Sequence, residues 1–303
     1  MTRFISDQNK VVLLHESGTY ASTSGNGYWI GQVIDNSIDD QEGKIEDRFM
    51  GALTRSFVSI TQGPRDVKGT ISYYPQDMRL PFFAIGSNVD TSGTNSFHLS
   101  TQINTNVWQS PFTSGTGQLA APISFTIEDS KTSPGTGTNF IRTIKGCVPD
   151  TVKITATKGE KVKVDIDYIG QTLIASSGAS TAVTASTSVP YLWNNCLLTV
   201  NGSALDTAKE VVLAIKQNLE APHYVNGSRD ISVPYPKNRE NTLDVTLDLD
   251  GTDADMLYNT FYKTNTQFNA TFDMNADSTT TGSQHAIYYL SGCRINNMAN
   301  PSV

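Results

Sequence analysis

Alternation of apolar and polar residues with a period of two constrains this chain more than any other feature. In residues 242–250, leucine and valine at odd positions alternate with aspartate and threonine at even positions. Successive side chains of an extended strand lie on opposite faces, so the pattern predicts a half-buried strand with one acidic, solvated face. Two similar runs at 152–157 and 162–168 flank the sequence KGEK and predict a β-hairpin. Residues 209–236 predict a strand, a long turn and another strand.

Helix signals are few, and the composition agrees with a β-rich chain. Gly251 ends the alternation, and Thr252 or Asp253 is suited to cap a short helix that continues through Met256 and Phe261. Hydrophobic residues make up 38% of the chain and charged residues only 17%. The remainder, rich in serine, threonine, asparagine and glycine, favours an all-β protein with long polar loops. The predicted fold class is an antiparallel β-sandwich or partly closed barrel in each half of the chain, with a short flanking helix.

The aspartates of residues 244–255 raise the alternative of a calcium site. An EF-hand loop that started at Asp248 would need a glycine at position 253 and a glutamate at position 259. Asp253 and Asn259 occupy those positions. We therefore expect Asp248, Asp250, Asp253 and Asp255 to shape a strand end and a helix cap rather than to bind a metal ion.

The segment SSGASTAVTASTSVP, residues 176–190, predicts a linker or a mobile loop between two domains, 1–175 and 191–303. The two parts repeat four features in the same order: a basic turn, a strand, an Asp-Met pair and an aromatic cluster. The pairs are Asp77-Met78 and Asp255-Met256. Farther along, ISFTIED (123–129) resembles FNATFDM (268–274). IRTIKGCVPD (141–150) resembles IYYLSGCRIN (287–296), which places Cys147 opposite Cys293.

This repetition predicts an internal duplication. The first part carries about 32 extra residues, which we assign to a long polar loop at 87–122. The second part ends before any counterpart of the hairpin at 151–173. Strands from the first part, from the N-terminal segment or from a neighbouring chain could complete its sheet.

No motif indicates catalysis. The histidines, cysteines and glycine-rich segments do not have the spacings of metal ligands, of a nucleophile with its base, or of a phosphate-binding loop. The formal net charge of −7 and the lack of a basic patch argue against sequence-specific nucleic-acid binding. No stretch is long and apolar enough to span a membrane. We expect no catalytic residue, no cofactor-binding residue, no metal site and no cofactor, and hence a protein that is not an enzyme.

Residues 211–261 resemble the tail tube (major tail) proteins of tailed bacterial or archaeal viruses. The resemblance begins with an apolar strand that ends in Gln217-Asn218-Leu219-Glu220. It continues with Tyr224, a Gly-Ser-Arg turn at 227–229, a basic turn with Lys237 and Arg239, a long amphipathic strand and a short helix that ends in aromatic residues. GCVPDTVKITATKGEKVKVDIDYIGQTL and GTYASTSGNGYWIGQV are similar to other parts of the same family.

The resemblance implies a structural virion protein whose rings stack into the tail tube, the conduit for the genome during ejection. It implies partners among other tail proteins, such as the tape measure and the terminator, and assembly in the host cytoplasm. DNA would pass through the lumen without specific binding, and a lumen lined with acidic and hydroxyl groups would suit this role. With two tube domains per chain, three chains would form a ring with pseudo-sixfold symmetry. If the two halves form one sandwich, six chains would be needed.

Two other function classes remain open from the residues alone. The chain could be another β-rich virion or surface module that stays monomeric or trimeric, such as a decoration or adhesion protein. It could also be a carbohydrate-binding sandwich, calcium-dependent through Asp248 and Asp250, in which Trp29, Trp108 and Trp193 stack on sugar rings. Electron microscopy of the purified protein separates these classes, because only a tube protein forms rings and tubes.

Overall fold

The computed structural model describes residues 9–16, 20–47, 59–76, 78–84, 124–132, 139–248, 255–275 and 285–298. Almost all of its regular structure is β-strand, and every pairing between its strands is antiparallel, which confirms the predicted fold class. The predicted loop at 87–122 lies outside the described residues.

The elements in chain order are β1 (Asn9–Glu16), β2 (Thr23–Tyr28), β3 (Gly31–Asp47), β4 (Ser59–Pro75), α1 (Arg79–Phe82), β5 (Phe125–Thr132), β6 (Asn139–Thr157), β7 (Lys163–Gly170), β8 (Thr172–Gly178), the 3₁₀ turn η2 (Trp193–Asn195), β9 (Cys196–Val200), β10 (Ser203–Ala204), β11 (Ala208–Lys216), β12 (Leu219–Glu220), β13 (Tyr235–Pro236), β14 (Glu240–Leu247), the π-helical segment η3 (Met256–Tyr262), β15 (Phe268–Asn275) and β16 (His285–Cys293).

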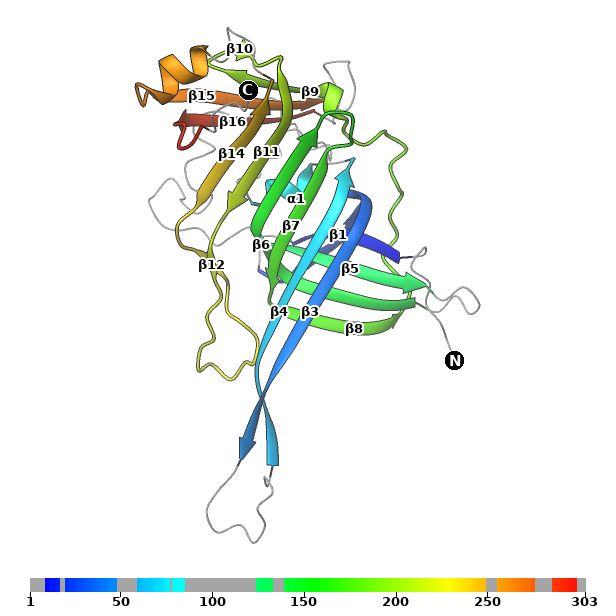
Figure 1. Ribbon diagram of the computed structural model, residues 1–303. Helices are drawn as coiled ribbons and strands as arrows, with labels where there is room; N and C mark the ends of the chain where they lie inside the picture. Colours follow the sequence, from blue (N-terminus) through cyan, green and yellow to red (C-terminus); the bar gives the residue numbers. More distant parts are fainter. Residues whose placement is uncertain are drawn as a thin grey trace.

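Strand β6 belongs to two layers of the fold. Its first part, 139–145, lies between β5 and β8, and its second part, 151–157, lies between β7 and β11. The result is a five-stranded layer, β2-β1-β5-β6-β8, and a six-stranded layer, β3-β4-β7-β6-β11-β14, which cross in Figure 1. A separate sheet, β10-β9-β15-β16, covers the β11–β14 end of the six-stranded layer.

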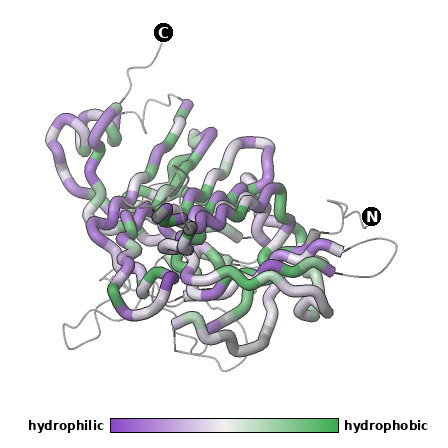
Figure 2. The backbone as a smooth tube through the Cα atoms, turned by 90° about the horizontal axis from the view of Figure 1, so that it is seen from below, coloured by the Kyte–Doolittle hydropathy of each residue, from purple (hydrophilic) through white to green (hydrophobic). Residues whose placement is uncertain are grey.

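The alternation that predicted strands also places the core. The strands of the predicted hairpin, β6 and β7, bury Val152, Ile154, Val164 and Ile166 on one face and leave polar side chains on the other. Hydrophobic and hydrophilic residues are interspersed along much of the described backbone in Figure 2. Burying one face of each strand between layers supplies the main driving force for the fold.

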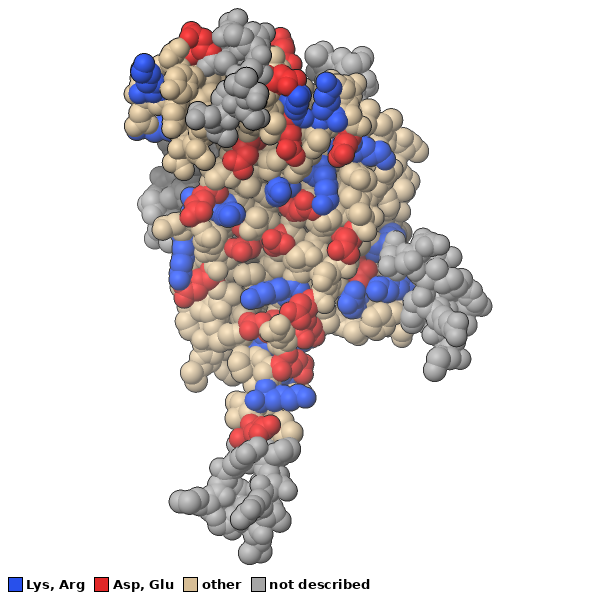
Figure 3. All heavy atoms as spheres, in the orientation of Figure 1, with Lys and Arg blue, Asp and Glu red and all other residues tan. Residues whose placement is uncertain are grey.

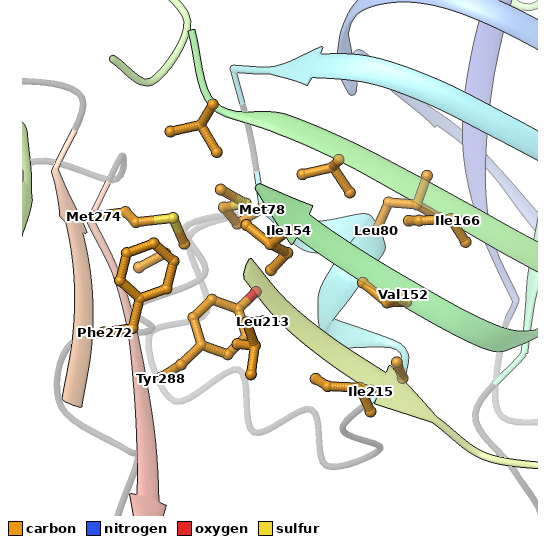
Figure 4. Packing of buried hydrophobic residues seen from close by; sticks show 14 of the residues in the cluster. Met78, Leu80, Val152, Ile154, Ile166, Leu213, Ile215, Phe272, Met274 and Tyr288 are labelled. Carbon is orange, nitrogen blue, oxygen red and sulfur yellow. The ribbon is translucent and has the colours of Figure 1, made fainter. Parts of the chain in front are cut away.

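The apolar core continues from the first part of the chain into the second. Met78 and Leu80, at the start of α1, lie beside Val152 of β6 and Leu213 of β11, and Phe272 of β15 lies on the other side of the same cluster (Figure 4). The core is therefore continuous between the two parts of the predicted division.

A buried carboxylate fixes the N-terminal strand to the five-stranded layer. Glu16 accepts hydrogen bonds from the backbone N–H groups of Ala21 and Gly146, each at 2.8 Å, and from the hydroxyl of Thr126 at 2.7 Å. The hydroxyl of Ser124 donates a fourth. A carboxylate that is buried is stable only when its acceptor sites are filled, and here they are.

The segment 176–190 begins within β8 and then continues along the first part of the chain. Thr181 donates from its backbone and its hydroxyl to the carboxylate of Glu128, at 2.7 and 2.5 Å. The side-chain amide of Gln76 donates to the carbonyls of Ser186 and Ser188. These contacts tie the segment to β5 and to the end of β4. The domain boundary placed there from the sequence stays a prediction.

Candidate functional surface

Two successive parts of the chain have the same order of elements and the same strand pairing, except that the second also contains the short β12–β13 pair between β11 and β14. In the first, β1 pairs with β2 and β5, β3 pairs with β4, α1 follows, and β5 pairs with β6. In the second, β9 pairs with β10 and β15, β11 pairs with β14, η3 follows, and β15 pairs with β16. We refer to the residues of β1–β6 as the first repeat and to those of β9–β16 as the second repeat.

An irregularity in strand pairing recurs at the same place in both repeats. Phe125 pairs with Cys147 and Phe268 pairs with Cys293, and in each case the register shifts at the next pair. The residue before each cysteine is a glycine with a left-handed backbone, φ +66° at Gly146 and +69° at Gly292. A glycine in this conformation is the signature of a β-bulge, because an L side chain there is strained.

The bulge organises the same packing in both repeats. The rings of Phe83 and Phe125 lie 5.0 Å apart between centroids, and those of Phe261 and Phe268 also lie 5.0 Å apart. Both cysteine thiols donate to a carbonyl three residues earlier, at 3.4 Å for Cys147 and 3.6 Å for Cys293. Burial raises the pKa of both thiols, which keeps them protonated. These cysteines are packing residues at matching places in two similar structural units.

The repeats differ at their C-terminal ends. In the first, β6 is followed by β7 and β8, which pair with it. Among the described residues that follow Cys293 there is no counterpart of these two strands. Instead β6 of the first repeat pairs with β11 of the second. The first part of the chain therefore contributes a strand beside the second, one of the possibilities that the sequence left open.

The solvent face of the six-stranded layer is polar across its width. Rows of paired residues run across it, for example from Ser72 through Asp165 to Lys153 and Ala214. Over the part of this face between the Asp39–Lys68 pair and the Glu210–Thr246 pair, the acidic residues are Asp35, Asp39, Asp165, Asp167, Glu210, Glu240 and Asp244. The basic residues are Lys68, Lys153, Lys163 and Lys216. Seven carboxylates against four ammonium groups give this face a net charge of −3, with threonine and serine hydroxyls between them.

Acidic side chains on this face are close enough to interact. Burial and the neighbouring carboxylates of Asp150 and Asp165 raise the pKa of Asp167. The ammonium of Lys163 contacts Asp165 at 2.9 Å, and the hydroxyl of Ser72 donates to the same carboxylate. Red and blue side chains are interspersed over this face in Figure 3. The surface is therefore mildly acidic and well hydrated, without a basic stripe or an apolar patch at its centre.

The β3–β4 hairpin projects beyond the body of the molecule (Figure 1). At its base, the guanidinium of Arg65 donates to both carboxylate oxygens of Asp40 at 2.7 Å and to the carbonyl of Leu173 at 3.0 Å. The loop 221–234 lies against the same part of the hairpin, where Arg229 donates to the carbonyl of Gly63 at 2.9 Å. His223 contacts Asp66 at 3.0 Å. These bonds fix the direction in which the hairpin leaves the body.

The two described aspartates considered for calcium have different partners. Asp248 contacts the ammonium of Lys209, and Asp255 accepts a hydrogen bond from Asn259 at 2.5 Å. Asp250 and Asp253 lie outside the described residues, and so does the cap predicted at Thr252 or Asp253. Within the described ranges, no group of three or more histidine, cysteine or acidic side chains is placed to hold a metal ion.

The tryptophans considered for sugar stacking have different surroundings. The indole N–H of Trp29 donates to the side chain of Gln76 at 2.6 Å, whereas Trp193 is exposed. Trp108 lies outside the described residues. No helix that the structure describes combines the length and the apolar character needed to cross a membrane.

Sequence analysis missed two features of this surface. The first is the pair Gly146 and Gly292, for which the shared Gly-Cys sequence was the available signal. The second is the particular pairing of β6 with β11. The sequence left open which strands complete the second part, and no local pattern selects a pairing between strands of different repeats.

Comparison with known proteins places the chain in a family. A family model described as "Phage tail tube protein" matches residues 11–301. Among solved structures, the SPP1 tail tube, determined by solid-state NMR and cryo-electron microscopy, matches with a TM-score of 0.34 and 8% sequence identity, over 59% of this chain and 82% of that chain. No curated protein matches. Since the family match covers nearly the whole chain, this protein belongs to the phage tail tube protein family and is a structural component of the viral tail.

Proposed function

We propose that three copies of this chain form one ring of the tube, and that the polar face of the six-stranded layer lines its bore. The observation that carries this proposal is the repeat. The matching bulges at Gly146-Cys147 and Gly292-Cys293, with the same aromatic pair beside each, support two tube domains per chain. Three such chains supply six domains around the bore.

The ends of the six-stranded layer supply a way to close the ring. β3 is paired only with β4, and β14 only with β11, within the described residues. Strand direction alternates across the layer, so β14 of one copy and β3 of the next can pair antiparallel in a head-to-tail arrangement. An unpaired sheet edge favours the addition of a strand, and a head-to-tail interface repeated around an axis gives a ring.

The number of strands favours three copies over six. Strands about 4.8 Å apart and tilted by about 40° each occupy about 6 Å of circumference. Three copies of the six-stranded layer give 18 strands and a backbone diameter of about 36 Å, whereas six copies give about 72 Å. A B-DNA duplex has a groove about 8 Å deep on each of its two sides, so it is at least about 16 Å across. The smaller bore therefore fits the duplex more closely than the larger one. This also holds if each copy contributes additional strands to the layer.

The chemistry of the polar face suits DNA passage. Carboxylates repel phosphates weakly over a Debye length of about 8–10 Å, and hydroxyl groups keep the surface hydrated. A row of lysines without carboxylates would instead hold the DNA by releasing its counterions. The face carries four lysines and seven acidic side chains. Its net charge is therefore negative, and it does not attract the phosphates of the genome.

The projecting β3–β4 hairpin is suited to contact the adjacent ring. It extends along the strand direction, and the bonds from Arg65 and Arg229 hold it in place. Stacked rings built in the host cytoplasm, with a tape measure protein inside and a terminator at the end, complete the proposed assembly.

Native mass spectrometry of a single ring tests the stoichiometry. Three chains of 32.9 kDa give about 99 kDa, and six give about 197 kDa. We expect the smaller mass, together with threefold symmetry and six similar lobes in averaged cross-sections of the tube. A ring of six identical chains would disprove the three-chain arrangement and leave the tube role in place.

A further inference from the structure

The helical segments of the two repeats align residue by residue, yet one face of each has a different environment. Met78 aligns with Met256, and the aromatic contacts align Phe83 with Phe261. Both phenylalanines are buried, at 6% and 5% exposure. With this alignment, Tyr258 and Tyr262 of the second repeat correspond to Leu80 and Ala84 of the first.

Leu80 and Ala84 are buried, whereas their counterparts are exposed. Leu80 is 1% and Ala84 0% exposed, against 46% for Tyr258 and 38% for Tyr262. The two tyrosine rings lie 5.8 Å apart between centroids and form a single aromatic patch on η3. We call Tyr258 and Tyr262 the tyrosine pair.

The second repeat covers α1 in the first repeat. The carbonyl of Ala84 accepts hydrogen bonds from the amide of Gln217 at 3.0 Å and from the guanidinium of Arg239 at 2.7 Å. Leu213 of β11 lies in the same apolar cluster as Leu80 (Figure 4). Gln217 and Arg239 follow β11 and precede β14, so the β11–β14 hairpin covers this end of α1.

We propose that the tyrosine pair is a contact between subunits of the ring, covered by the β3–β4 hairpin of a second copy of this chain. This inference rests on the proposed ring. Inside one chain, the first repeat contacts the second at one junction. In the proposed ring, the second repeat of one chain contacts the first repeat of the next chain at an equivalent junction. Since β3–β4 corresponds to β11–β14, it is the element that covers η3 at this second junction.

The residue types at the two junctions agree with the stage at which each junction forms, during folding or during assembly. Leucine and alanine suit a contact that forms once, during folding, and is never exposed. Tyrosine suits a surface that is wet before assembly and buried after it, because its ring supplies apolar area and its hydroxyl remains able to hydrogen-bond. An aromatic pair near the middle of a contact is the kind of feature that dominates binding energy.

The test compares two double variants of the full chain. In Tyr258→Ser/Tyr262→Ser both rings are removed, and in the matched control Tyr258→Phe/Tyr262→Phe only the hydroxyls are removed. Both positions are exposed in the free chain, so the melting temperature of each unassembled variant should stay within about 2 °C of the original. Analytical ultracentrifugation and electron microscopy then follow ring and tube formation as the protein is concentrated.

We expect the serine variant to need roughly tenfold or more higher concentration to form rings, and the phenylalanine variant to assemble like the original. Hydroxyl-radical footprinting should show both tyrosines protected in rings of the original chain. Rings of the serine variant at the original concentration would overturn the inference while leaving the tube role intact. Normal single rings that fail to stack would also overturn it, by placing the tyrosine pair between rings. If the original chain forms no rings under any condition, the proposed function itself fails.

Discussion

At the residue scale, Gly146 and Gly292 have matching backbones but different surroundings. A Cβ atom on Gly146 would lie 2.8 Å from the ring of Tyr20, whereas one on Gly292 would have no atom of the described residues within 4 Å, its chain neighbours aside. We expect Gly292→Ala to lower the free energy of unfolding by about 1–2 kcal/mol through the left-handed backbone alone. Gly146→Ala should cost more, since it adds this overlap to the same backbone strain. Urea denaturation of the two variants measures both, and equal losses would show that the Tyr20 ring moves aside freely.

Asp167 provides a pH test of the polar face. Burial and two neighbouring carboxylates raise the pKa of its carboxyl above the ordinary 3.8. The folded state therefore binds this proton more tightly than the unfolded state, so the folded state loses stability as pH rises from 3.8 through the raised value. Asp167→Asn removes this loss. We expect the variant to melt at a higher temperature than the original at pH 7, and the difference to vanish below pH 3.8.

Calorimetry across this pH range checks the prediction, with Asp206→Asn, an exposed aspartate outside the polar face, as the control. If the melting temperature of the control variant rises by as much at pH 7, the effect comes from net charge rather than from the neighbours of Asp167.

Single residues show how far sequence reasoning extends. The Asp-Met and Gly-Cys pairs identify matching positions in the two repeats, because both occur in similar local patterns. The exposure of Tyr258 against the burial of Leu80 could not be predicted, since it depends on which repeat covers which helix and not on the helix itself.

At the element scale, Arg65 determines how firmly the β3–β4 hairpin is held. Its bidentate contact with Asp40 lowers the pKa of that carboxyl, mainly through the hydrogen bond. We expect Arg65→Gln to cost about 1–2 kcal/mol, because a charge-assisted pair is lost. Hydrogen exchange should accelerate in the hairpin and leave β6 and β7 unchanged. Uniform acceleration in all strands would mean that the hairpin unfolds only with the whole molecule.

The same contact has a pH dependence of the opposite sign to that of Asp167. A lowered pKa means that the stability contributed by Asp40 is present above pH 3.8 and is lost as pH falls through the lowered value. In the Arg65→Gln variant this acid sensitivity of the hairpin should disappear. Hydrogen-exchange rates of the hairpin, measured at pH 3 and pH 6 on the original chain and on the Arg65→Gln variant, check this prediction.

The strands were predictable where one face is buried. The alternation in 152–168 and 242–250 predicted β6, β7 and β14, because a period of two leaves little other choice. The packing of loop 221–234 against the hairpin was not predictable. It depends on polar contacts such as Arg229 with Gly63, which join residues more than 160 positions apart.

At the scale of the whole molecule, the charge of the polar face can be reversed. Asp35→Lys, Asp167→Lys and Asp244→Lys together change its net charge from −3 to +3 per chain. We expect tubes of this variant to bind duplex DNA at low salt, with affinity that falls steeply as salt rises. The matched variant with asparagine at the three positions brings the net charge of the face to zero, and its tubes should bind DNA weakly. Co-sedimentation of DNA with assembled tubes measures both, and equal retention by the two variants would place the face outside the bore.

The whole fold was predictable only in class. Composition and alternation indicate antiparallel β-structure, and the repeated order of features indicates duplication. The continuous layer through β6 and β11 joins residues of both repeats, so it follows from no segment taken alone.

The pairing of β6 with β11 has a consequence for the kinetics of assembly. In the proposed ring of three chains, half of the junctions between tube domains form within a chain, during folding, and so do not depend on protein concentration. Three free chains then need two encounters to form a ring instead of the five that six free chains need, since the last contact closes the ring. Each encounter avoided spares the loss of translational and rotational freedom of one free subunit. Ring formation should therefore begin at lower protein concentration, and rise less steeply with it, than in a tube whose six domains arrive on separate chains.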